Sequence, residues 1–241
     1  INRKAWLLEI TDGGKDLYPE IKKRARKKLA AWRKGPEKNF DMVRLYMMLN
    51  FGYYITESSE HLSEYVPYFI KSNYPHLVEE FNIPLDEYPR RCVNQIAHWE
   101  EQKKSLRGAS LTHSRTHEYG SHIMESVTTG QPIVIGGNLL NNGLITNLPS
   151  NACVEVSCLV DKNGVQGTYV GDLPEQCAAL NRTNINTQLL TLEAAFTGKK
   201  DHIYHAAMLD PHTSTELSID DIRALCDDLI KAHDTWLPKF K

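Results

Sequence analysis

The chain has 241 residues, of which 41% are hydrophobic and 24% are charged. This composition is typical of a folded globular protein, and it excludes a disordered, collagen-like or coiled-coil chain. The formal net charge of −2 gives no reason to expect nucleic acid or an anionic membrane as a partner. No apolar run approaches the roughly 20 residues that a membrane-spanning helix needs, and no apolar segment of the signal-peptide type follows Ile1. We therefore expect a cytoplasmic protein.

The five cysteines are widely scattered and show no CxxC spacing. A disulfide framework or a zinc site is not expected from such a pattern, and we interpret these residues as reduced side chains that pack as small hydrophobes.

The N-terminal third predicts a strand followed by helices. Residues Asn2–Ile10 are expected to form a strand that ends at the turn Asp12-Gly13-Gly14. Asp16 then caps a helix, because apolar residues recur at helical spacing from Ile21 to Trp32. The basic residues between them are interpreted as a solvated helix face rather than a polyanion patch.

The middle of the chain predicts further helices. They cover Asp41–Leu49, a segment through Cys92, Ile96 and Trp99, and a segment capped by Ser114 and ended by Gly130. The charged residues Lys103–Gly108 are expected to form a loop.

From Ile133 the pattern changes to strands, with apolar alternation over Ala152–Val160 and a hairpin turn at Asp161–Gly164. Helices follow to the C-terminus; Gly198 ends the first and a capping box at Ser218 begins the last. The order predicts an α+β fold, mostly helical, with a small mixed or antiparallel sheet. Because no GxGxxG or Walker loop is present, the chain by itself is not expected to bind a dinucleotide through either loop.

Several blocks, spread in order along nearly the whole chain, resemble the family 4 glycoside hydrolases, specifically the melibiase-type α-galactosidases. The blocks are Gly52–His61 with Glu64-Tyr65, Pro84–Cys92, Asn142–Pro149 with Val154–Val156, Tyr204–Thr213 and Trp236–Pro238. The similar portion is the C-terminal half of the family, whose fold resembles the C-terminal domain of lactate dehydrogenase. The resemblance therefore implies one substrate-binding and oligomerisation domain over residues 1–241, with the N-terminal Rossmann domain absent from the chain. Because the chain opens on Ile1 in mid-pattern, we expect residues to precede it in the native protein.

The resemblance implies hydrolysis of α-galactosides with NAD and Mn²⁺ as cofactors. In this family the sugar is oxidised at C3, which acidifies the proton on C2; elimination, addition of water and reduction follow. The implied partners are an α-galactoside substrate, the upstream Rossmann domain and identical subunits in a homodimer or homotetramer. Activity of this chain alone is not expected.

The junction motif departs from the family at the metal site. The family has a metal-binding His where this chain has Arg3, and a guanidinium has no lone pair with which to bind a metal. Three interpretations stay open: the first residues do not report the native junction, the protein is catalytically impaired, or Arg3, with Lys4, stabilises the C3 oxyanion in place of the metal. We assign no metal ligand.

The candidate catalytic residues are Glu57, His61, Tyr53 and Tyr54. Some relatives use a tyrosine near this point as the base, which would need a nearby cation because a free tyrosine has a pKa near 10; packing in the core is the alternative for both rings. Glu57 and His61 would share a face of a helix, and a carboxylate with an imidazole suits proton transfer or hydroxyl recognition.

The candidate substrate-binding residues are Asn2, Ser58, Arg115, Tyr119 and Asn147. Ser58 could instead cap a helix. The sequence leaves two other functions open: α-glucosidase or α-galacturonidase specificity on the same scaffold, and a non-catalytic sugar-binding or assembly protein.

Overall fold

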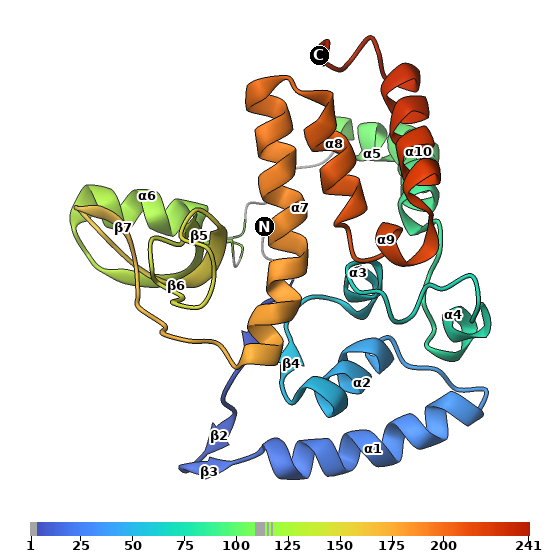
Figure 1. Cartoon of the computed structure of the whole chain (residues 1–241). Coiled ribbons are helices and arrows are strands. Elements are labelled where there is room, and N and C mark those ends of the chain that lie inside the picture. The colour runs from blue at the N-terminus through green and yellow to red at the C-terminus, as the bar shows by residue number, and fades with distance from the viewer. Residues whose placement is uncertain (1–3, 109–113, 115, 117) are drawn as a thin grey trace. The chain divides into compact units, whose positions relative to one another are not determined.

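The computed structural model describes residues 4–108, 114, 116 and 118–241. The strands are β1 (Trp6–Leu7), β2 (Thr11–Asp12), β3 (Lys15–Asp16), β4 (Tyr54–Ile55), β5 (Ile133–Leu140), β6 (Cys153–Asp161) and β7 (Gly164–Gly167). The helices are α1 (Tyr18–Lys34), α2 (Met42–Phe51), α3 (Ser59–Glu64), α4 (His76–Glu80), α5 (Glu87–Gly108), α6 (Gly120–Thr129), α7 (Glu175–Thr197), α8 (Lys200–Met208), α9 (Thr213–Glu216) and α10 (Ile219–Ala232). Helices dominate and the sheets are small (Figure 1), which confirms the predicted α+β class.

The chain divides into two compact units. The first comprises the described parts of Ile1–Ile83, together with Gly136–Cys158 and Gly167–Lys241. The second comprises the described parts of Pro84–Ile135, together with Leu159–Gln166. Most of the candidate residues belong to the first unit.

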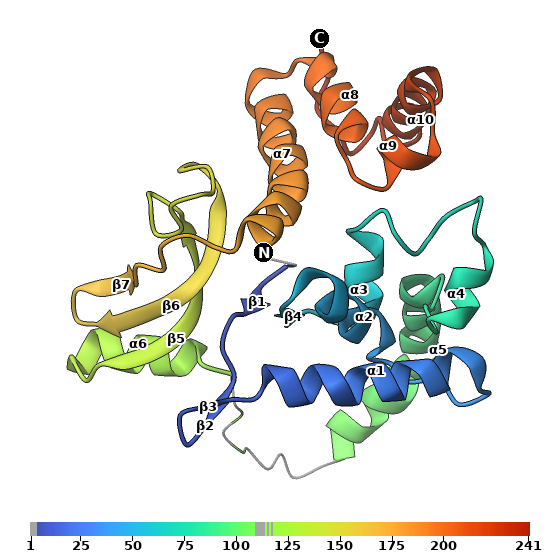
Figure 2. The same cartoon turned by 60° about the horizontal axis from the view of Figure 1, so that its bottom comes forward.

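The N-terminal part of the first unit is built on a short strand pair and two packed helices. In the antiparallel pair β1–β4, Trp6 lies opposite Ile55. The β2–β3 hairpin turns at two glycines with positive φ, as the sequence predicts, and leads directly into α1 (Figure 2). Ala25 and Leu29 lie four residues apart on α1 and are both buried, so the helix places this stripe against the core.

The C-terminal part of the first unit is a set of packed helices. Figure 1 shows α8 between α7 and α10, and it packs against both. Gly198 ends α7 in the left-handed conformation at φ 67°. Ser218 begins α10, where its Oγ accepts a hydrogen bond from the backbone N of Asp221 at 3.2 Å. The structure thus confirms both predicted helix ends.

Strands β5, β6 and β7 form one sheet in that order. Along β6 the side chains alternate between exposed and buried, and the buried set is the predicted one: Val154, Val156, Cys158 and Val160.

Two boundaries in the second unit differ from prediction. Residues 103–108 belong to α5 instead of a loop; lysine, leucine and arginine are good helix formers, so their charge was a poor argument against a helix. Helix α6 begins at Gly120 with Tyr119 as the preceding cap residue, so Ser114 does not cap it. Gly130 ends α6 as predicted, at φ 79°.

Among the described residues, none of the helices combines the length and the apolar character that a membrane span requires.

Candidate functional site

The polar block Thr56–His61 leaves strand β4 and forms the first turn of α3. Its start is held against the N-terminal strand, because the backbone N of Thr56 donates to the carbonyl oxygen of Ala5 at 2.9 Å. Ser58 is the N-cap of α3, and its Oγ accepts a hydrogen bond from the backbone N of His61 at 3.2 Å. The hydroxyl of Ser58 therefore has a local structural role in addition to the predicted contact with a sugar.

Glu57 and His61 lie on either side of this cap. Glu57 precedes the cap and lies outside α3. Glu57 and His61 therefore do not share a helical face, contrary to the prediction from the sequence. A carboxylate oxygen of Glu57 accepts from the backbone N of Ser58 at 2.9 Å, and Nδ1 of His61 lies 3.0 Å from a carboxylate oxygen of Glu64. Both Glu57 and His61 are half-buried. The turn therefore presents an imidazole and a carboxylate, the groups most used for proton transfer.

Tyr54 is tied into a network with two residues of the region around α2. Its hydroxyl lies 3.0 Å and 3.1 Å from the two carboxylate oxygens of Asp41, and the guanidinium of Arg44 lies 4.9 Å from its ring centroid. Burial, together with the negative charge of Asp41, raises the pKa of Tyr54 to about 12, although the cation of Arg44 opposes this shift. A phenol with so high a pKa is a weaker base candidate than Glu57 or His61.

Arg44 also links this network to the polar block. Its side chain bonds to Asp41 at 2.5 Å, and its backbone N donates to Oγ of Ser59 at 3.2 Å. Neither Asp41 nor Arg44 was among the predicted site residues. Their spacing of three residues at the start of α2 is the signal that a search for helical ion pairs would have found.

Tyr53 precedes strand β4 and has polar and aromatic partners other than those of Tyr54, although both rings pack against the cluster of Tyr18, Ala25 and Met48. Its ring packs edge-to-face on Tyr18 with centroids 5.8 Å apart. The two tyrosines, predicted together as base candidates, therefore have different surroundings.

Asn2 and Arg3 lie outside the described residues, so the structure leaves their predicted roles open. The next residue, Lys4, is only 2% exposed, and its Nζ donates to the carbonyl oxygen of Leu180 at 3.0 Å. Burial lowers the pKa of Lys4 to about 7, although the carboxylate of Asp210 opposes this shift. An amine with a pKa near neutrality exchanges protons readily at physiological pH.

The remaining predicted sugar contacts are dispersed. Arg115 lies outside the described residues. Tyr119 belongs to the second unit, where it precedes α6 and is 46% exposed. Asn147 pairs with the backbone of Leu173, donating to its carbonyl oxygen at 2.8 Å and accepting from its N at 3.0 Å. Asn147 therefore holds two chain segments together, and its role toward a sugar stays a prediction.

Asn141 is a fully buried polar residue that was not among the predicted site residues. Its amide N donates to the carbonyl oxygens of Ile145, Leu148 and Pro149 at 2.9, 3.0 and 3.1 Å, and its amide O accepts from the backbone N of Ile145 at 2.8 Å. Asn141 therefore shapes the loop that carries Asn147, one of the predicted sugar contacts.

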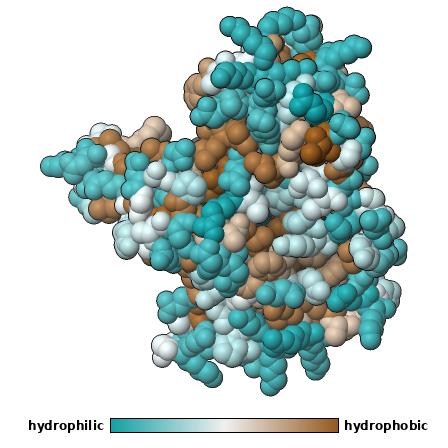
Figure 3. Space-filling model, viewed as in Figure 1, coloured by the Kyte–Doolittle hydropathy of each residue, from teal (hydrophilic) through white to brown (hydrophobic). Residues whose placement is uncertain are grey.

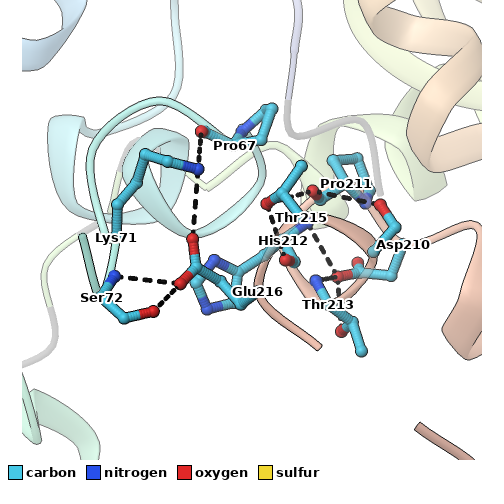
Figure 4. Close-up of polar contacts among 10 residues, drawn as sticks. Pro67, Lys71, Ser72, Asp210, Pro211, His212, Thr213, Thr215 and Glu216 are labelled. Carbon is cyan, nitrogen blue, oxygen red and sulfur yellow. Dashed lines mark hydrogen bonds and ion pairs between the residues drawn. The ribbon is translucent and has the colours of Figure 1, made fainter. Parts of the chain in front are cut away.

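A second polar cluster joins α9 to the segment that follows α3 (Figure 4). One carboxylate oxygen of Glu216 pairs with Nζ of Lys71 at 3.1 Å; the other accepts from the backbone N of Ser72 at 2.9 Å and from its hydroxyl. Asp210 organises the neighbouring turn by accepting from the backbone N of Thr213 at 2.9 Å. The contacts of Glu216 with Lys71 and Ser72 connect chain segments more than 140 positions apart.

Within the described residues, Glu60, His61 and Glu64 are the group whose carboxylate and imidazole atoms lie within 4.8 Å of one another. Oxygen and nitrogen donors of these kinds are compatible with Mn²⁺. However, the three residues lie on one short, partly exposed helix, and Glu64 and His61 already bond to each other. This set does not fit a resident metal centre, and we derive no catalytic step through it.

The fold is an α+β domain shared with the C-terminal regions of glycosidases of known structure. The profile of the "Family 4 glycosyl hydrolase C-terminal domain" matches residues 1–213. This chain belongs to the family 4 glycosyl hydrolases and represents the C-terminal portion of the family.

The chain is similar to curated relatives that are about twice as long. It is 58% identical to the α-galactosidase of Bacillus subtilis (strain 168), over 100% of this chain and 55% of the relative. It is 23% identical to an α-galacturonidase of Thermoanaerobacter italicus, over 95% of this chain and 52% of the relative. The chain therefore spans about half the length of these relatives.

Solved structures share the fold at low sequence identity. A putative glucosidase, lplD, from Bacillus subtilis matches with a TM-score of 0.80 at 20% identity, covering 95% of this chain and 54% of that one. The 6-phospho-β-glucosidase of Thermotoga maritima, solved with manganese, NAD⁺ and glucose-6-phosphate, matches with a TM-score of 0.69 at 16% identity, covering 100% and 53%.

Proposed function

We propose that this chain is the C-terminal part of an enzyme that hydrolyses α-galactosides. The observation that carries this proposal is the 58% identity to the α-galactosidase of Bacillus subtilis over the full length of the chain. The polar block Thr56–His61, which is held on a structured turn against the N-terminal strand, supplies groups suited to act on a sugar.

We propose NAD and Mn²⁺ as the cofactors, on the support of the Thermotoga maritima enzyme solved with both. NAD would supply a hydride acceptor, and Mn²⁺ would supply a Lewis acid. We assign NAD to the part of the protein that relatives carry outside the matched half. We assign no metal ligand in this chain, because the described residues offer no group that fits a metal centre. An N-terminal Rossmann domain is the proposed partner.

Within this chain, we propose Glu57 and His61 as the groups that move protons. Both occupy the same turn, and each is oriented by a polar contact to a neighbouring residue. Ser58, Asn2, Arg115, Tyr119 and Asn147 stay proposals as sugar contacts. In this proposal Arg44 is a positioning residue, because its backbone N bonds to Ser59 and its guanidinium bonds to the carbonyl oxygen of Thr56. Asp41 supports it by pairing with the Arg44 side chain.

The direct test is an assay of the full-length protein that carries this chain, with NAD, Mn²⁺ and a reductant. The substrates are nitrophenyl α-galactoside, α-glucoside and α-galacturonide. We expect the highest kcat/KM for the α-galactoside. Preference for the galacturonide would favour the alternative specificity, to which the similarity with the Thermoanaerobacter relative points. Retention of galactoside binding without any turnover would favour a non-catalytic sugar-binding protein.

We also propose that the protein forms a homodimer or homotetramer through its C-terminal helices. Large apolar side chains are exposed there, and brown apolar patches are visible among the teal side chains in Figure 3. Phe196, in the last turn of α7, is 85% exposed, and Trp236, which follows α10, is 86% exposed. Exposed apolar area of this kind is typical of an interface.

A further inference from the structure

The first unit contains a polar cavity of about 460 Å³ at the end of the β1–β4 pair that lies away from the polar block. Its chemically useful lining residues are Glu9, Asp16, Tyr18, Lys22, Tyr53 and Gln176. The volume falls in the range of small-molecule sites, roughly 300–1,000 Å³. Residues 57–61 do not line this cavity, and neither does Tyr54.

Part of the wall is held in place by hydrogen bonds. The hydroxyl of Tyr18 donates to the carbonyl oxygen of Leu7 and accepts from the backbone N of Tyr54 at 3.1 Å. The side chain of Gln176 donates to the carbonyl oxygen of Phe51 at 3.0 Å. A wall fixed in this way needs little ordering when a ligand binds.

Other side chains of the lining have unused hydrogen-bond donors or acceptors. In the part of the chain that the structure describes, the side chains of Glu9, Lys22 and Tyr53 make no hydrogen bond or ion pair. Nζ of Lys22 lies 5.0 Å from the ring centroid of Tyr18 and 6.0 Å from that of Tyr53. The cavity thus combines a free carboxylate, a free ammonium group and a phenol hydroxyl beside two aromatic rings.

These groups match the chemistry of a neutral saccharide. A sugar ring has apolar C–H faces that pack on aromatic rings, here the partly exposed ring of Tyr53 because that of Tyr18 is buried. Its hydroxyls both donate and accept hydrogen bonds. The carboxylates of Glu9 and Asp16 would accept from hydroxyls, and the ammonium group of Lys22 would donate. Two carboxylates in the lining also disfavour a phosphorylated sugar by charge repulsion.

We propose that this cavity is a second saccharide-binding site, separate from the turn at residues 57–61, which binds a neutral galactosyl unit. The choice of a galactosyl unit rests on the proposed function, whereas the existence of the site rests on the cavity. A site of this kind would hold a remote unit of an oligosaccharide, or a second sugar molecule.

The test is hydrogen–deuterium exchange of the full-length protein titrated with methyl α-D-galactopyranoside, the probe, with Glu57→Gln introduced to slow consumption of the sugar. We expect the probe to protect peptides covering residues 8–22 and 51–53 in a saturable manner. Lys22→Met and Glu9→Gln should each raise the probe concentration for half-protection by at least about tenfold, because each removes a charged hydrogen-bond partner. Lys22→Arg, which keeps the charge, should restore most of the protection.

Lys23→Met is the matched control, since Lys23 is the adjacent lysine but does not line the cavity; it should leave protection unchanged. No protection of residues 8–22 at saturating probe, or equal protection in wild type and Lys22→Met, would overturn the proposal. Hydrolysis is measured separately. Suppose that the protein hydrolyses no galactoside but the probe still protects residues 8–22, and Lys22→Met abolishes this protection. That result would support the site while rejecting the proposed function.

Discussion

The Nζ of Lys4 donates a hydrogen bond to the carbonyl oxygen of Leu180 at 3.0 Å, across 176 positions of the chain. The same Nζ lies 3.4 Å from Oγ1 of Thr183. This amine ties the start of the described chain to helix α7. The nearby indole of Trp6 does the same, because its N donates to the side-chain oxygen of Asn181 at 2.9 Å.

The buried amine of Lys4 predicts a pH dependence of stability. Because its pKa is lowered from 10.5 to about 7 in the folded protein, the unfolded chain binds more protons between about pH 7 and pH 10.5. The free energy of unfolding should therefore rise with pH across that window, by on the order of 5 kcal/mol from this group. Urea unfolding at pH 6.5, 8 and 9.5 measures the rise.

The comparison variant is Lys4→Met, which keeps the apolar stem and removes the amine. Thr183 still donates to the carbonyl oxygen of Leu180 at 2.7 Å, so that acceptor stays paired. The difference in unfolding free energy between wild type and Lys4→Met should grow with pH. If the two profiles run parallel, Lys4 is not the titrating group.

Substitutions in the polar block should separate proton transfer from positioning. Glu57→Gln and His61→Ala should each lower kcat of the full-length enzyme by at least about 10²-fold, the usual scale for acid–base groups. Tyr54→Phe should lower it by less than about tenfold, because a phenol with a pKa of about 12 is a poor base at neutral pH. Near-normal rates in both Glu57→Gln and His61→Ala would show that the proposed block is wrong.

The hydroxyl of Ser58 can be tested as a cap and as a sugar contact in one experiment. Ser58→Ala should lower the free energy of unfolding by about 1 kcal/mol, since it removes the cap of α3, whereas Ser58→Asp should restore stability. If Ser58→Asp recovers both stability and KM, the residue acts as a cap alone. A raised KM in a fully stable Ser58→Asp enzyme would support the sugar contact.

Glu216 should make the protein more sensitive to acid. Hydrogen bonds from the side chain and backbone of Ser72, then from Lys71, lower the pKa of Glu216 from 4.5 to about 2. Its contribution is present above pH 4.5 and is lost as the pH falls towards about 2. Thermal melts between pH 5 and pH 2.5 should show a steeper loss in wild type than in Glu216→Gln. Glu193→Gln, at an exposed position on α7, is the control and should follow wild type.

Asn141 should matter for stability although it was not a predicted site residue. Asn141→Ala leaves the buried carbonyl oxygens of Ile145 and Leu148 without the side-chain donor that serves both. We expect a loss of about 2–3 kcal/mol in the free energy of unfolding, the usual cost of unsatisfied buried groups. Denaturant unfolding measures this loss. Asn142, in the exposed turn beside Asn141, is not a suitable control position, because its backbone has a positive φ of 41°. Asn163→Ala, at an exposed hairpin position, serves instead; a loss of similar size there would count against the specific role of Asn141.

The regular elements could be predicted because their signals are local. The alternation along β6, the glycine at the end of α7 and the capping box before α10 each involve residues within a few positions of one another. The polar block could be singled out for a similar reason: so many polar side chains between apolar segments are costly unless they are bonded or used.

The sequence by itself determined the α+β class and the family, and it predicted the segment in which the site is proposed. Only the tertiary structure decided what each side chain touches. The adjacent tyrosines have different partners, since the hydroxyl of Tyr54 bonds to Asp41 while Tyr53 lines the cavity beside Lys22. The burial of Lys4 against Leu180 could not be predicted either. A pKa depends on burial and on charges brought close in space, and a pattern of neighbouring residues carries no information about partners 176 positions away.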